Sequence, residues 1–378
     1  MLNGLQDYLL RIISGEKKGV LPALIRLLLS FLEIIYFLII NMAYFLYHTG
    51  IKESKELPCR VISIGNITTG GTGKTPLVKL LAETFKKDNY NTVIISSGYR
   101  TDNKEARVIY DGEKLLVSEK EAGDEALMLS RLLSGIPVIT GKDRYLAGKL
   151  AIGEFSPDII LLDDGFQYWQ LARDRDIVLI DATNPFGYQH LLPGGLLREP
   201  LKALKRADLF LITKINYVDK EKLEDIIRTI KKYNTAAPIF TAKYESSFLR
   251  IYQKDGEVRL LPADALYGRK LLAFSGIGNP ASFQRSLEEC GGEVLFHYIY
   301  PDHYQYSLND IIEMRRRILR DNSPGVPAKG ADLIITTEKD LVRLDREMRS
   351  ILIAECDLAV LEMEVKIDKK EEFFKLMI

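Results

Sequence analysis

Glycines, a lysine and several threonines follow one another in the stretch GNITTGGTGKTPL at residues 65–77. Glycine lets backbone amides approach phosphate oxygens closely, and a lysine placed after the glycines can reach the outer phosphates of a nucleotide. A hydroxyl in the next position can join the coordination shell of a magnesium ion. These residue types in this order predict a phosphate-binding loop. Its predicted members are Thr68, Thr69, Gly70, Gly71, Thr72, Gly73, Lys74 and Thr75.

The segments on either side of this loop support the interpretation. Residues 60–66 (RVISIGN) are an apolar run typical of a strand, and residues 76–87 (PLVKLLAETFKK) have helical periodicity. Strand, glycine-rich turn and helix is the order that a P-loop requires, and the helix N-terminus adds a positive dipole end. The strict G-x4-G-K-[ST] pattern is not met, because Thr68 occupies the place of the first glycine. The alternative is a chance GKT in a surface loop.

Two adjacent carboxylates end a second apolar run, DIILLDDGFQY, at residues 158–168. In P-loop folds, a carboxylate at the end of a neighbouring strand holds magnesium directly or through water. Asp163 and Asp164, together with Thr75, are therefore the candidate magnesium ligands. The alternative is an ordinary strand-end turn, because Asp-Asp-Gly is favourable turn chemistry.

Short apolar runs alternate with amphipathic segments along most of the chain, which is typical of an α/β protein. The runs are nearly continuous, as expected for a mostly parallel sheet that is covered on both faces. We expect a P-loop NTPase-like domain, a second, smaller α/β domain joined to it by a two-stranded connector, and an N-terminal membrane-docking helix. The strands expected in the first domain are 60–66, 92–96, 136–140, 158–163, 176–181 and 208–213. The expected boundaries are 1–50 for the helical segment, 51–238 for the P-loop domain, 239–262 for the connector and 263–378 for the smaller domain.

The N-terminal stretch from Leu27 to Tyr47 has 21 residues, and Glu33 is its one formal charge. About 20 apolar residues suffice to cross a bilayer. On a helical projection, however, the polar residues gather in a narrow stripe, which favours a helix lying on or dipping into the membrane surface. A full span and a helix buried against the protein's own domain are the alternatives. The stripe comprises Arg26, Ser30, Glu33, Asn41, Tyr44 and His48, with Phe37 its one apolar member.

The composition excludes several classes of protein. The 378 residues suggest two or three domains, and 47% apolar residues are too many for a disordered chain. Lys+Arg and Asp+Glu both number 52, so the zero net charge argues against a nucleic-acid partner. Cys59, Cys290 and Cys356 lie far apart, which predicts neither a disulfide framework nor a zinc site and fits a reducing cytoplasm.

Five motifs occur in a fixed order along the chain: GGTGKTP, GDEA, LLDDGFQ, LLPGGLLREPL and FSGIGNP. Together they resemble the tetraacyldisaccharide 4'-kinases, the lipid A 4'-kinases of Gram-negative bacteria, from the apolar helix to TTEKD near residue 340. The resemblance implies transfer of the γ-phosphate of ATP, with Mg²⁺, to the 4'-hydroxyl of an acylated glucosamine disaccharide 1-phosphate. It also implies an enzyme at the cytoplasmic face of the bacterial inner membrane, peripheral or anchored by its N-terminus. We expect a monomer whose partners are ATP, this lipid and the membrane surface.

The resemblance further implies roles for individual residues. Asp124 in GDEA takes the place of the family's catalytic carboxylate, and His303 in PDH takes that of the histidine paired with it. Two positions depart from the family pattern: Ser97 replaces an arginine and Tyr168 replaces a histidine, which leaves both roles open. Lys74 and Thr75 match the nucleotide-binding lysine and threonine, and the implied substrate-binding residues are Tyr99, Glu125, Arg144, Gln167, Arg198 and Glu199.

A sugar hydroxyl is a weak acid, so its phosphorylation needs alignment, help in losing the proton, and charge stabilisation. We expect Lys74, the loop amides and magnesium to balance the charge, and Asp124 to take the proton. His303 would orient Asp124, and the two would meet only when the domains close. Arg198 suits the acceptor's 1-phosphate, and Glu199 could pair with Arg198 or bind sugar hydroxyls. The alternatives are a helix N-cap for Asp124, followed by Glu125 as an acidic first-turn residue, and a turn role for His303.

Two other classes of function compete with the kinase. One is a membrane-associated ATPase switch of the partition or targeting type, which carries K-G-G-x-G-K-T. Thr69 stands at the position of that signature lysine, which argues against the switch. The other is a membrane-tethered nucleotide-binding scaffold without turnover.

Overall fold

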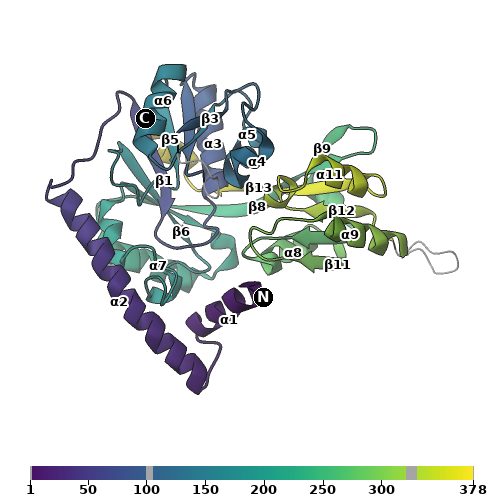
Figure 1. Cartoon of the computed structure of the whole chain (residues 1–378), viewed down its shortest axis with the longest axis horizontal. Helices are drawn as coiled ribbons and strands as arrows, with labels where there is room; N and C mark the ends of the chain where they lie inside the picture. The colour runs from purple at the N-terminus through teal and green to yellow at the C-terminus, as the bar shows by residue number, and fades with distance from the viewer. Residues whose placement is uncertain (1, 99–104, 321–329, 378) are drawn as a thin grey trace. The chain divides into compact units, whose positions relative to one another are not determined.

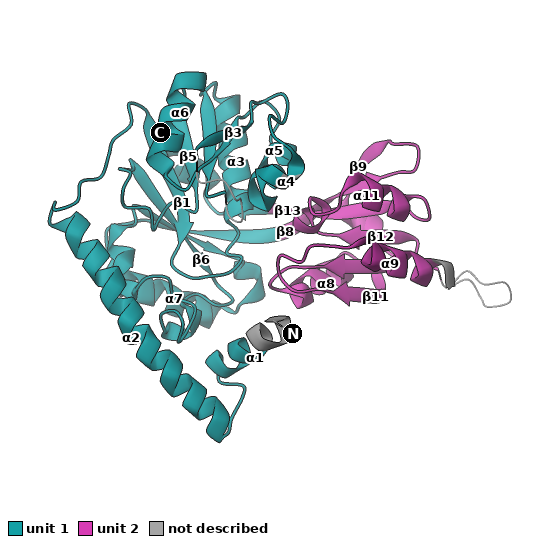
Figure 2. Ribbon diagram, viewed as in Figure 1, with its two compact units in different colours: residues 1–244, 365–378 teal, residues 245–364 magenta. Residues whose placement is uncertain are grey.

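The structure is a computed structural model, and it describes residues 2–98, 105–320 and 330–377. The chain divides into two compact units, which Figure 2 colours separately. Unit 1 comprises residues 1–244 and 365–378, and unit 2 comprises residues 245–364. The chain leaves unit 1 within strand β8 (Ile239–Tyr252) and returns to it within strand β13 (Leu358–Ile367). The domain boundaries expected from the sequence remain a prediction.

Unit 1 is built on a sheet with strand order β8-β7-β6-β1-β5-β2-β4-β3. Neighbouring strands are parallel from β8 to β4, so the predicted parallel sheet is confirmed. The edge strand β3 runs antiparallel to β4 and was not predicted, because four residues are too short for a clear pattern. The strands are β1 (Arg60–Asn66), β2 (Thr92–Ser96), β3 (Arg107–Tyr110), β4 (Val138–Thr140), β5 (Ile159–Asp163), β6 (Arg175–Asp181) and β7 (Leu209–Thr213).

Helices cover both faces of this sheet (Figure 1). Helix α3 has the sequence period of an amphipathic helix, and its buried side chains Leu77, Leu81 and Phe85 follow one another at four-residue spacing. The helices of unit 1 are α1 (Leu2–Ile13), α2 (Val20–His48), α3 (Lys74–Lys87), α4 (Glu119–Ala122), α5 (Asp124–Leu132), α6 (Arg144–Phe155), α7 (Lys220–Tyr233) and α12 (Lys370–Lys375). Short 3-10 helices lie at Gly187–Gln189, Leu201–Arg206 and Ile215–Tyr217.

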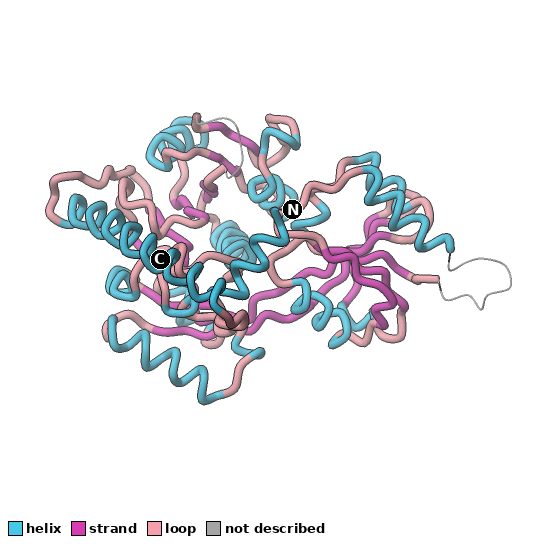
Figure 3. Tube along the Cα trace, turned by 60° about the horizontal axis from the view of Figure 1, so that its bottom comes forward, coloured by secondary structure: helices cyan, strands magenta, loops and turns pink. Residues whose placement is uncertain are grey.

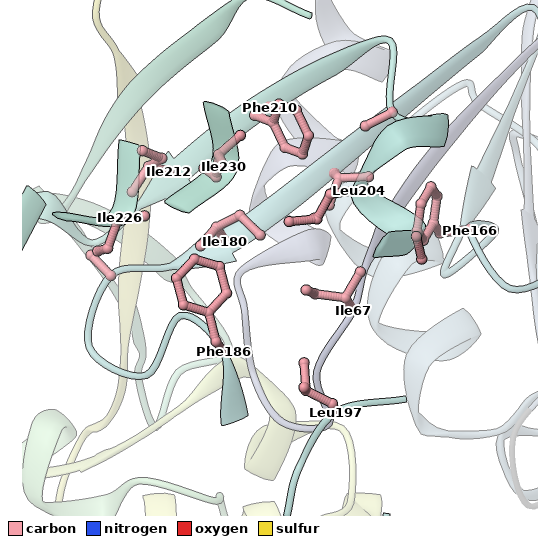
Figure 4. Packing of buried hydrophobic residues seen from close by; sticks show 14 of the residues in the cluster. Ile67, Phe166, Ile180, Phe186, Leu197, Leu204, Phe210, Ile212, Ile226 and Ile230 are labelled. Atoms are coloured by element: carbon pink, nitrogen blue, oxygen red, sulfur yellow. The ribbon is translucent and has the colours of Figure 1, made fainter. Parts of the chain in front are cut away.

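The hydrophobic core of unit 1 anchors the strands whose ends carry the candidate site. Figure 4 shows one cluster, in which Ile226 and Ile230 of α7 pack with Ile180 of β6 and Phe210 of β7. A second cluster packs α6 against β1, β2, β4 and β5. Burying one such side chain stabilises the fold by about 1.5–3 kcal/mol. Truncating Phe210 to alanine would therefore loosen the sheet beneath the site.

Unit 2 is a smaller α/β layer structure, as predicted. Its strand order is β11-β10-β12-β13, all parallel, with β8 beyond β13 and β9 antiparallel to β8. Leu271 and Ala273 of β10 face the cluster of α8, whereas Leu272 and Phe274 face that of α9 and α11, so helices lie on either side of the strands (Figure 3). The elements are β9 (Val258–Pro262), β10 (Lys270–Ser275), α8 (Pro280–Glu289), β11 (Glu293–Ile299), α9 (Leu308–Arg320), β12 (Leu333–Thr336), α10 (Glu338–Leu341) and α11 (Arg346–Ile353), with a 3-10 helix at Ala263–Leu266.

Helix α2 turns its predicted polar stripe towards unit 1 and its apolar residues away from it. Glu33 accepts a hydrogen bond from the amide of Leu191 at 2.7 Å, and Asn41 accepts one from Lys202. In the described part of the chain, α2 is the one helix long and apolar enough to cross a membrane by length and composition, and its most apolar window has no buried residue. The polar side of α2 is thus bonded to its own unit, whereas much of its apolar side is exposed, and whether the helix spans a membrane stays open. The exposed apolar residues include Leu24, Leu28, Phe31, Ile35, Leu38, Ile39, Met42 and Phe45.

Candidate functional site

The predicted phosphate-binding loop connects the end of β1 to the start of α3, as the sequence indicated. Gly73 precedes the helix with φ of 88°, a left-handed conformation that favours glycine. A Cβ atom at Gly73 would also collide with the hydroxyl of Tyr244, which donates a hydrogen bond to the Gly73 carbonyl at 2.7 Å. A Cβ atom at Gly70 or Gly71 would meet nothing within 4 Å, so the crest of the loop is open.

Side chains from the neighbouring strands hold this loop from behind. Thr213 donates to the carbonyl of Thr72 at 3.0 Å, and Lys214 donates to that of Gly71 at 2.8 Å. Lys214 also forms an ion pair with Asp181 at the end of β6. With Tyr244, three successive loop carbonyls are bound, which fixes the backbone from which the amides would meet phosphate. These residues were not predicted, because nothing in their local sequence pattern links them to a loop that lies 141 to 171 positions away.

Lys74 and Arg198 share one carboxylate next to the loop. Lys74 Nζ lies 3.3 Å from Asp164 Oδ1, and Arg198 Nη1 lies 2.7 Å from the same oxygen. Both cations also donate to Asn66 Oδ1, at 3.2 and 3.3 Å. Burial alone would raise the pKa of Asp164, but the two cations hold it at about 2. The structure thus brings together three predicted site residues from three segments.

Asp163, the last residue of β5, has a different environment from Asp164. Its side chain is only 3% exposed, and its Oδ1 has no hydrogen-bond partner among the described residues. Burial raises its pKa to about 7, the Glu125 carboxylate adds to this effect, and Lys74 opposes it. A buried carboxylate oxygen without a donor is an available ligand for a cation.

The oxygen ligands available next to the phosphate-binding loop fit magnesium better than a metal that is coordinated by protein side chains alone. Magnesium is commonly held by one or two protein oxygens together with nucleotide phosphates and water. Asp163 offers an unpartnered oxygen, and Thr75 offers a hydroxyl in the first turn of α3. No group of three or more His, Cys, Asp or Glu side chains that could enclose a metal occurs among the residues that the structure describes.

Glu199 and Gln167, both predicted to bind substrate, belong to a buried polar network. Gln167 donates to the carbonyl of Asn66 at 2.9 Å and to Glu199 at 3.0 Å. Glu199 is 1% exposed and receives two hydrogen bonds from Arg206, at 2.7 and 3.0 Å. Of the two possibilities that the sequence left open for Glu199, an ion pair is present, but its partner is Arg206. Arg206 was not predicted; its guanidinium lies over the Phe166 ring at 4.3 Å.

Arg144 and Tyr168 meet at the N-terminus of α6. Arg144 is buried, donates to the carbonyl of Gly141 at 2.7 Å, and lies 5.6 Å from the centre of the Tyr168 ring. The Tyr168 hydroxyl donates to Asp143 at 3.0 Å, and Asp143 caps the helix. Burial, with a smaller effect from Asp143, raises the pKa of Tyr168 to about 12. Tyr168, at the position where the sequence departs from the family, therefore supports the helix cap beside Arg144.

Asp124 and Glu125 open helix α5 directly after Gly123, whose φ is 77°. The Glu125 carboxylate helps to raise the pKa of Asp163 at the end of β5. Asp124 is the first residue of the helix and lies at its positive dipole end, but Gly123 is the N-cap, so the N-cap role that was the alternative for Asp124 is not present. Tyr99, another predicted substrate-binding residue, lies outside the described residues.

His303 belongs to unit 2 and is held there by backbone and side-chain contacts. Its backbone has φ of 60°, and its amide donates to the carbonyl of Gly276 at 3.1 Å. Arg343 Nη2 lies 3.2 Å from His303 Nδ1. Because a guanidinium can only donate, Nδ1 accepts this bond, which leaves the ring proton on Nε2. The predicted pairing of His303 with Asp124 joins residues of different units and stays a prediction.

The chain is similar to known proteins over most of its length. The family model of tetraacyldisaccharide-1-P 4'-kinase (LpxK) matches residues 25–378. The chain is 40% identical over 379 residues to the tetraacyldisaccharide 4'-kinase of Halothermothrix orenii, covering 97% of this chain and 96% of that protein. It is 38% identical to the enzyme of the same name from Syntrophus aciditrophicus, covering 87% of each chain.

Among solved structures, the chain is similar to LpxK from Aquifex aeolicus, crystallised as an "apo" form in complex with ATP. The TM-score is 0.72 at 33% sequence identity, and the match covers 93% of this chain and 98% of that one. A family match over nearly the whole length also removes the support for a partition or targeting switch. The chain belongs to the tetraacyldisaccharide-1-P 4'-kinase family.

Proposed function

We propose that this protein transfers the γ-phosphate of ATP to the 4'-hydroxyl of an acylated glucosamine disaccharide 1-phosphate at a membrane surface. The observation that carries the proposal is the convergence of Lys74, Arg198 and the carboxylates of Asp163 and Asp164 at an open P-loop. Family membership supports the lipid acceptor, and the ATP complex of the Aquifex aeolicus protein supports ATP as the donor.

On the donor side, the two cations that share Asp164 are the candidates for binding phosphate. The oxygens of a triphosphate would compete with Asp164 Oδ1 for Lys74, which lies 3.3 Å away and at the start of α3. Lysine and the loop amides would then stabilise the charge on the transferring group. Arg198 would take a phosphate oxygen, of the nucleotide or of the acceptor's 1-phosphate, through a charge-assisted hydrogen bond.

Magnesium is the metal that we propose for this site. Asp163 and the hydroxyl of Thr75 would hold it, because Asp163 Oδ1 is buried without a donor. Bound there with the phosphates, the ion would supply positive charge that neutralises the triphosphate.

On the acceptor side, Asp124 is the residue that we propose to take the hydroxyl proton. Its place at the start of α5, next to Glu125, whose carboxylate acts on Asp163, supports this role. A general base contributes about 10²–10⁴-fold to a rate. His303, with its proton on Nε2, would orient the carboxylate or share the proton.

The exposed apolar residues of α2 support a location at a membrane surface, which suits a lipid acceptor. We expect a chain lacking residues 1–48 to bind vesicles less than the whole protein, because the exposed apolar residues are removed. Flotation with phospholipid vesicles measures this, and equal flotation of the two chains would contradict the membrane role.

The test of the proposed function is the transfer of label from γ-labelled ATP to the acylated disaccharide 1-phosphate in detergent. We expect labelled lipid that depends on both the acceptor and Mg²⁺. Release of free phosphate at the same rate without acceptor would instead indicate an ATPase switch. Nucleotide binding with neither product would indicate a scaffold.

A further inference from the structure

Residues 190–198, which include most of the LLPGGLLREPL motif, contact both helix α2 and the phosphate-binding loop. On the loop side, the amide of Arg198 donates to the carbonyl of Ile67 at 2.7 Å. The amide of Thr69 donates to the carbonyl of Leu196 at 2.8 Å, and Thr68 forms an antiparallel bridge with Leu197. This segment therefore pairs with the loop as a short strand would.

On the other side, the same segment is bonded to α2. Glu33 accepts from the amide of Leu191 at 2.7 Å and contacts His190 Nδ1 at 3.1 Å. The hydroxyl of Tyr36 donates to the carbonyl of Arg198 at 2.9 Å, across 162 positions of sequence. A Cβ atom at Gly194 would collide with the Glu33 carboxylate, so the glycine allows the segment to approach the helix.

Arg198 is the residue where these contacts meet. Its carbonyl is bound by Tyr36, its amide by Ile67, and its guanidinium by Asp164. A shift of its backbone would move the guanidinium relative to Asp164 and Lys74. Rotation of a long side chain can absorb part of such a shift, but not without lengthening a charge-assisted bond of 2.7 Å.

We infer that Tyr36 is a positioning residue for phosphoryl transfer: its hydrogen bond to the Arg198 carbonyl lets helix α2 hold Arg198 in register with the phosphate-binding loop. Helix α2 then has two separable roles, because many of its apolar residues are exposed whereas Glu33 and Tyr36 bind the segment. This inference rests on the proposed function for its kinetic consequence, but the positioning itself can be measured without turnover.

The experiment compares Tyr36→Phe with two control variants of the same helix in the whole protein. Tyr47→Phe is the matched control, because the Tyr47 ring packs at 6.1 Å from the Trp169 ring and a phenylalanine keeps that contact. Leu38→Ser is the membrane control, because Leu38 is 60% exposed. For each variant we would measure kcat, the KM values for ATP and lipid, vesicle flotation and the thermal midpoint.

We expect Tyr36→Phe to lower kcat at saturating lipid in detergent roughly two- to tenfold, as loss of one hydrogen bond would, with the KM for ATP, flotation and thermal midpoint unchanged. Tyr47→Phe should behave as the unaltered protein. Leu38→Ser should reduce flotation but leave kcat unchanged. An unaltered kcat in Tyr36→Phe, or a fall that flotation or melting fully accounts for, would overturn the inference.

Amide hydrogen exchange provides the second measurement, which does not depend on activity. We expect Tyr36→Phe, but not Tyr47→Phe, to speed exchange in peptides that contain the Arg198 and Thr69 amides, because their bonds link the segment to the loop. Unchanged exchange would overturn the inference even if the unaltered protein phosphorylates the lipid. Faster exchange in a protein that transfers no label would support the positioning and contradict only the proposed function.

Discussion

Each unit has a buried aspartate near the ends of its parallel strands, Asp163 in unit 1 and Asp340 in unit 2. The two differ in the hydrogen-bond donors that surround them. Asp340 of unit 2 accepts hydrogen bonds from the Gly276 amide at 2.9 Å, the Tyr306 hydroxyl at 3.0 Å and Arg343 at 3.1 Å. The Thr337 hydroxyl binds its other oxygen at 2.6 Å. Asp163 of unit 1 is also buried, yet its Oδ1 has no donor among the described residues.

We interpret Asp340 as a carboxylate that stabilises the fold and Asp163 as one whose oxygen is available to a ligand, as proposed above. Asp340 joins the loop after β10, the loop that carries Tyr306, and the start of α10 into one network. Its polar groups are satisfied, as is normal for buried ones. Leaving Asp163 Oδ1 without a donor costs stability, and a cation bound as proposed would supply the partner that the protein does not.

The largest expected effect comes from Asp163→Asn. We expect activity to fall roughly a thousandfold, because an amide cannot supply the charge that a bound cation needs. The free protein should be equally stable or more stable, since the amide is neutral in the buried position. The lipid phosphorylation assay and thermal melts measure the two effects, and a clear loss of stability would remove the distinction between the aspartates.

In unit 2 the corresponding variant is Asp340→Ala, and we expect its main effect to be a lower free energy of unfolding. Arg343, whose side chain is 1% exposed, would lose its ion pair with Asp340, and breaking a buried ion pair in this way costs about 3–5 kcal/mol. Urea unfolding of the whole protein measures the change. Asp345→Ala, which removes only the cap of α11, is the control, and its expected cost is about 1 kcal/mol. Equal costs for both would contradict the structural role of Asp340.

Asp124→Ala and His303→Ala test whether a residue of unit 2 acts in the same step as one of unit 1. We expect each to lower kcat about a hundredfold, as loss of general-base assistance does, with nucleotide binding retained. If the two act as a pair, the double variant should be little slower than either single variant. Multiplying effects would indicate independent roles, and near-normal turnover of Asp124→Ala would remove it as the base.

The smallest expected effect is a pH dependence of stability from Asp163. Its pKa is about 7 in the folded protein, above its ordinary value near 4, so the folded state keeps the proton to higher pH than the unfolded chain. The stability that this bound proton gives to the folded state is fully present below about pH 4 and is lost as the pH rises towards 7. Between pH 5 and 7.5 we expect the free energy of unfolding of Asp163→Asn to fall by about 2 kcal/mol less than that of the unaltered protein. Urea unfolding at a series of pH values measures this difference. Parallel pH profiles would show that Asp163 is ionised throughout.

Local sequence was sufficient for the elements that carry the site. The apolar runs predicted the parallel strands β1, β2 and β4 to β7, and the order of glycines and lysine predicted the loop between β1 and α3. These features depend on neighbours along the chain, such as side-chain period and the conformational freedom of glycine. The polar stripe of α2 was also readable, because helical geometry alone puts its members on one side.

The partners of the site residues could not be predicted in the same way. Arg198 binds Asp164, 34 positions away, and Tyr36 binds the Arg198 carbonyl, 162 positions away. No local period relates such residues, so their pairing depends on how strands, loops and helix α2 pack.

The sequence by itself determined that this protein has a phosphate-binding loop on a parallel sheet, since both follow from short-range chemistry. Only the tertiary structure determined that Asp164 is paired with two cations, whereas Asp163 Oδ1 has no donor among the described residues. That difference follows from burial and from contacts between distant segments, which the folded chain creates and no short stretch of sequence contains.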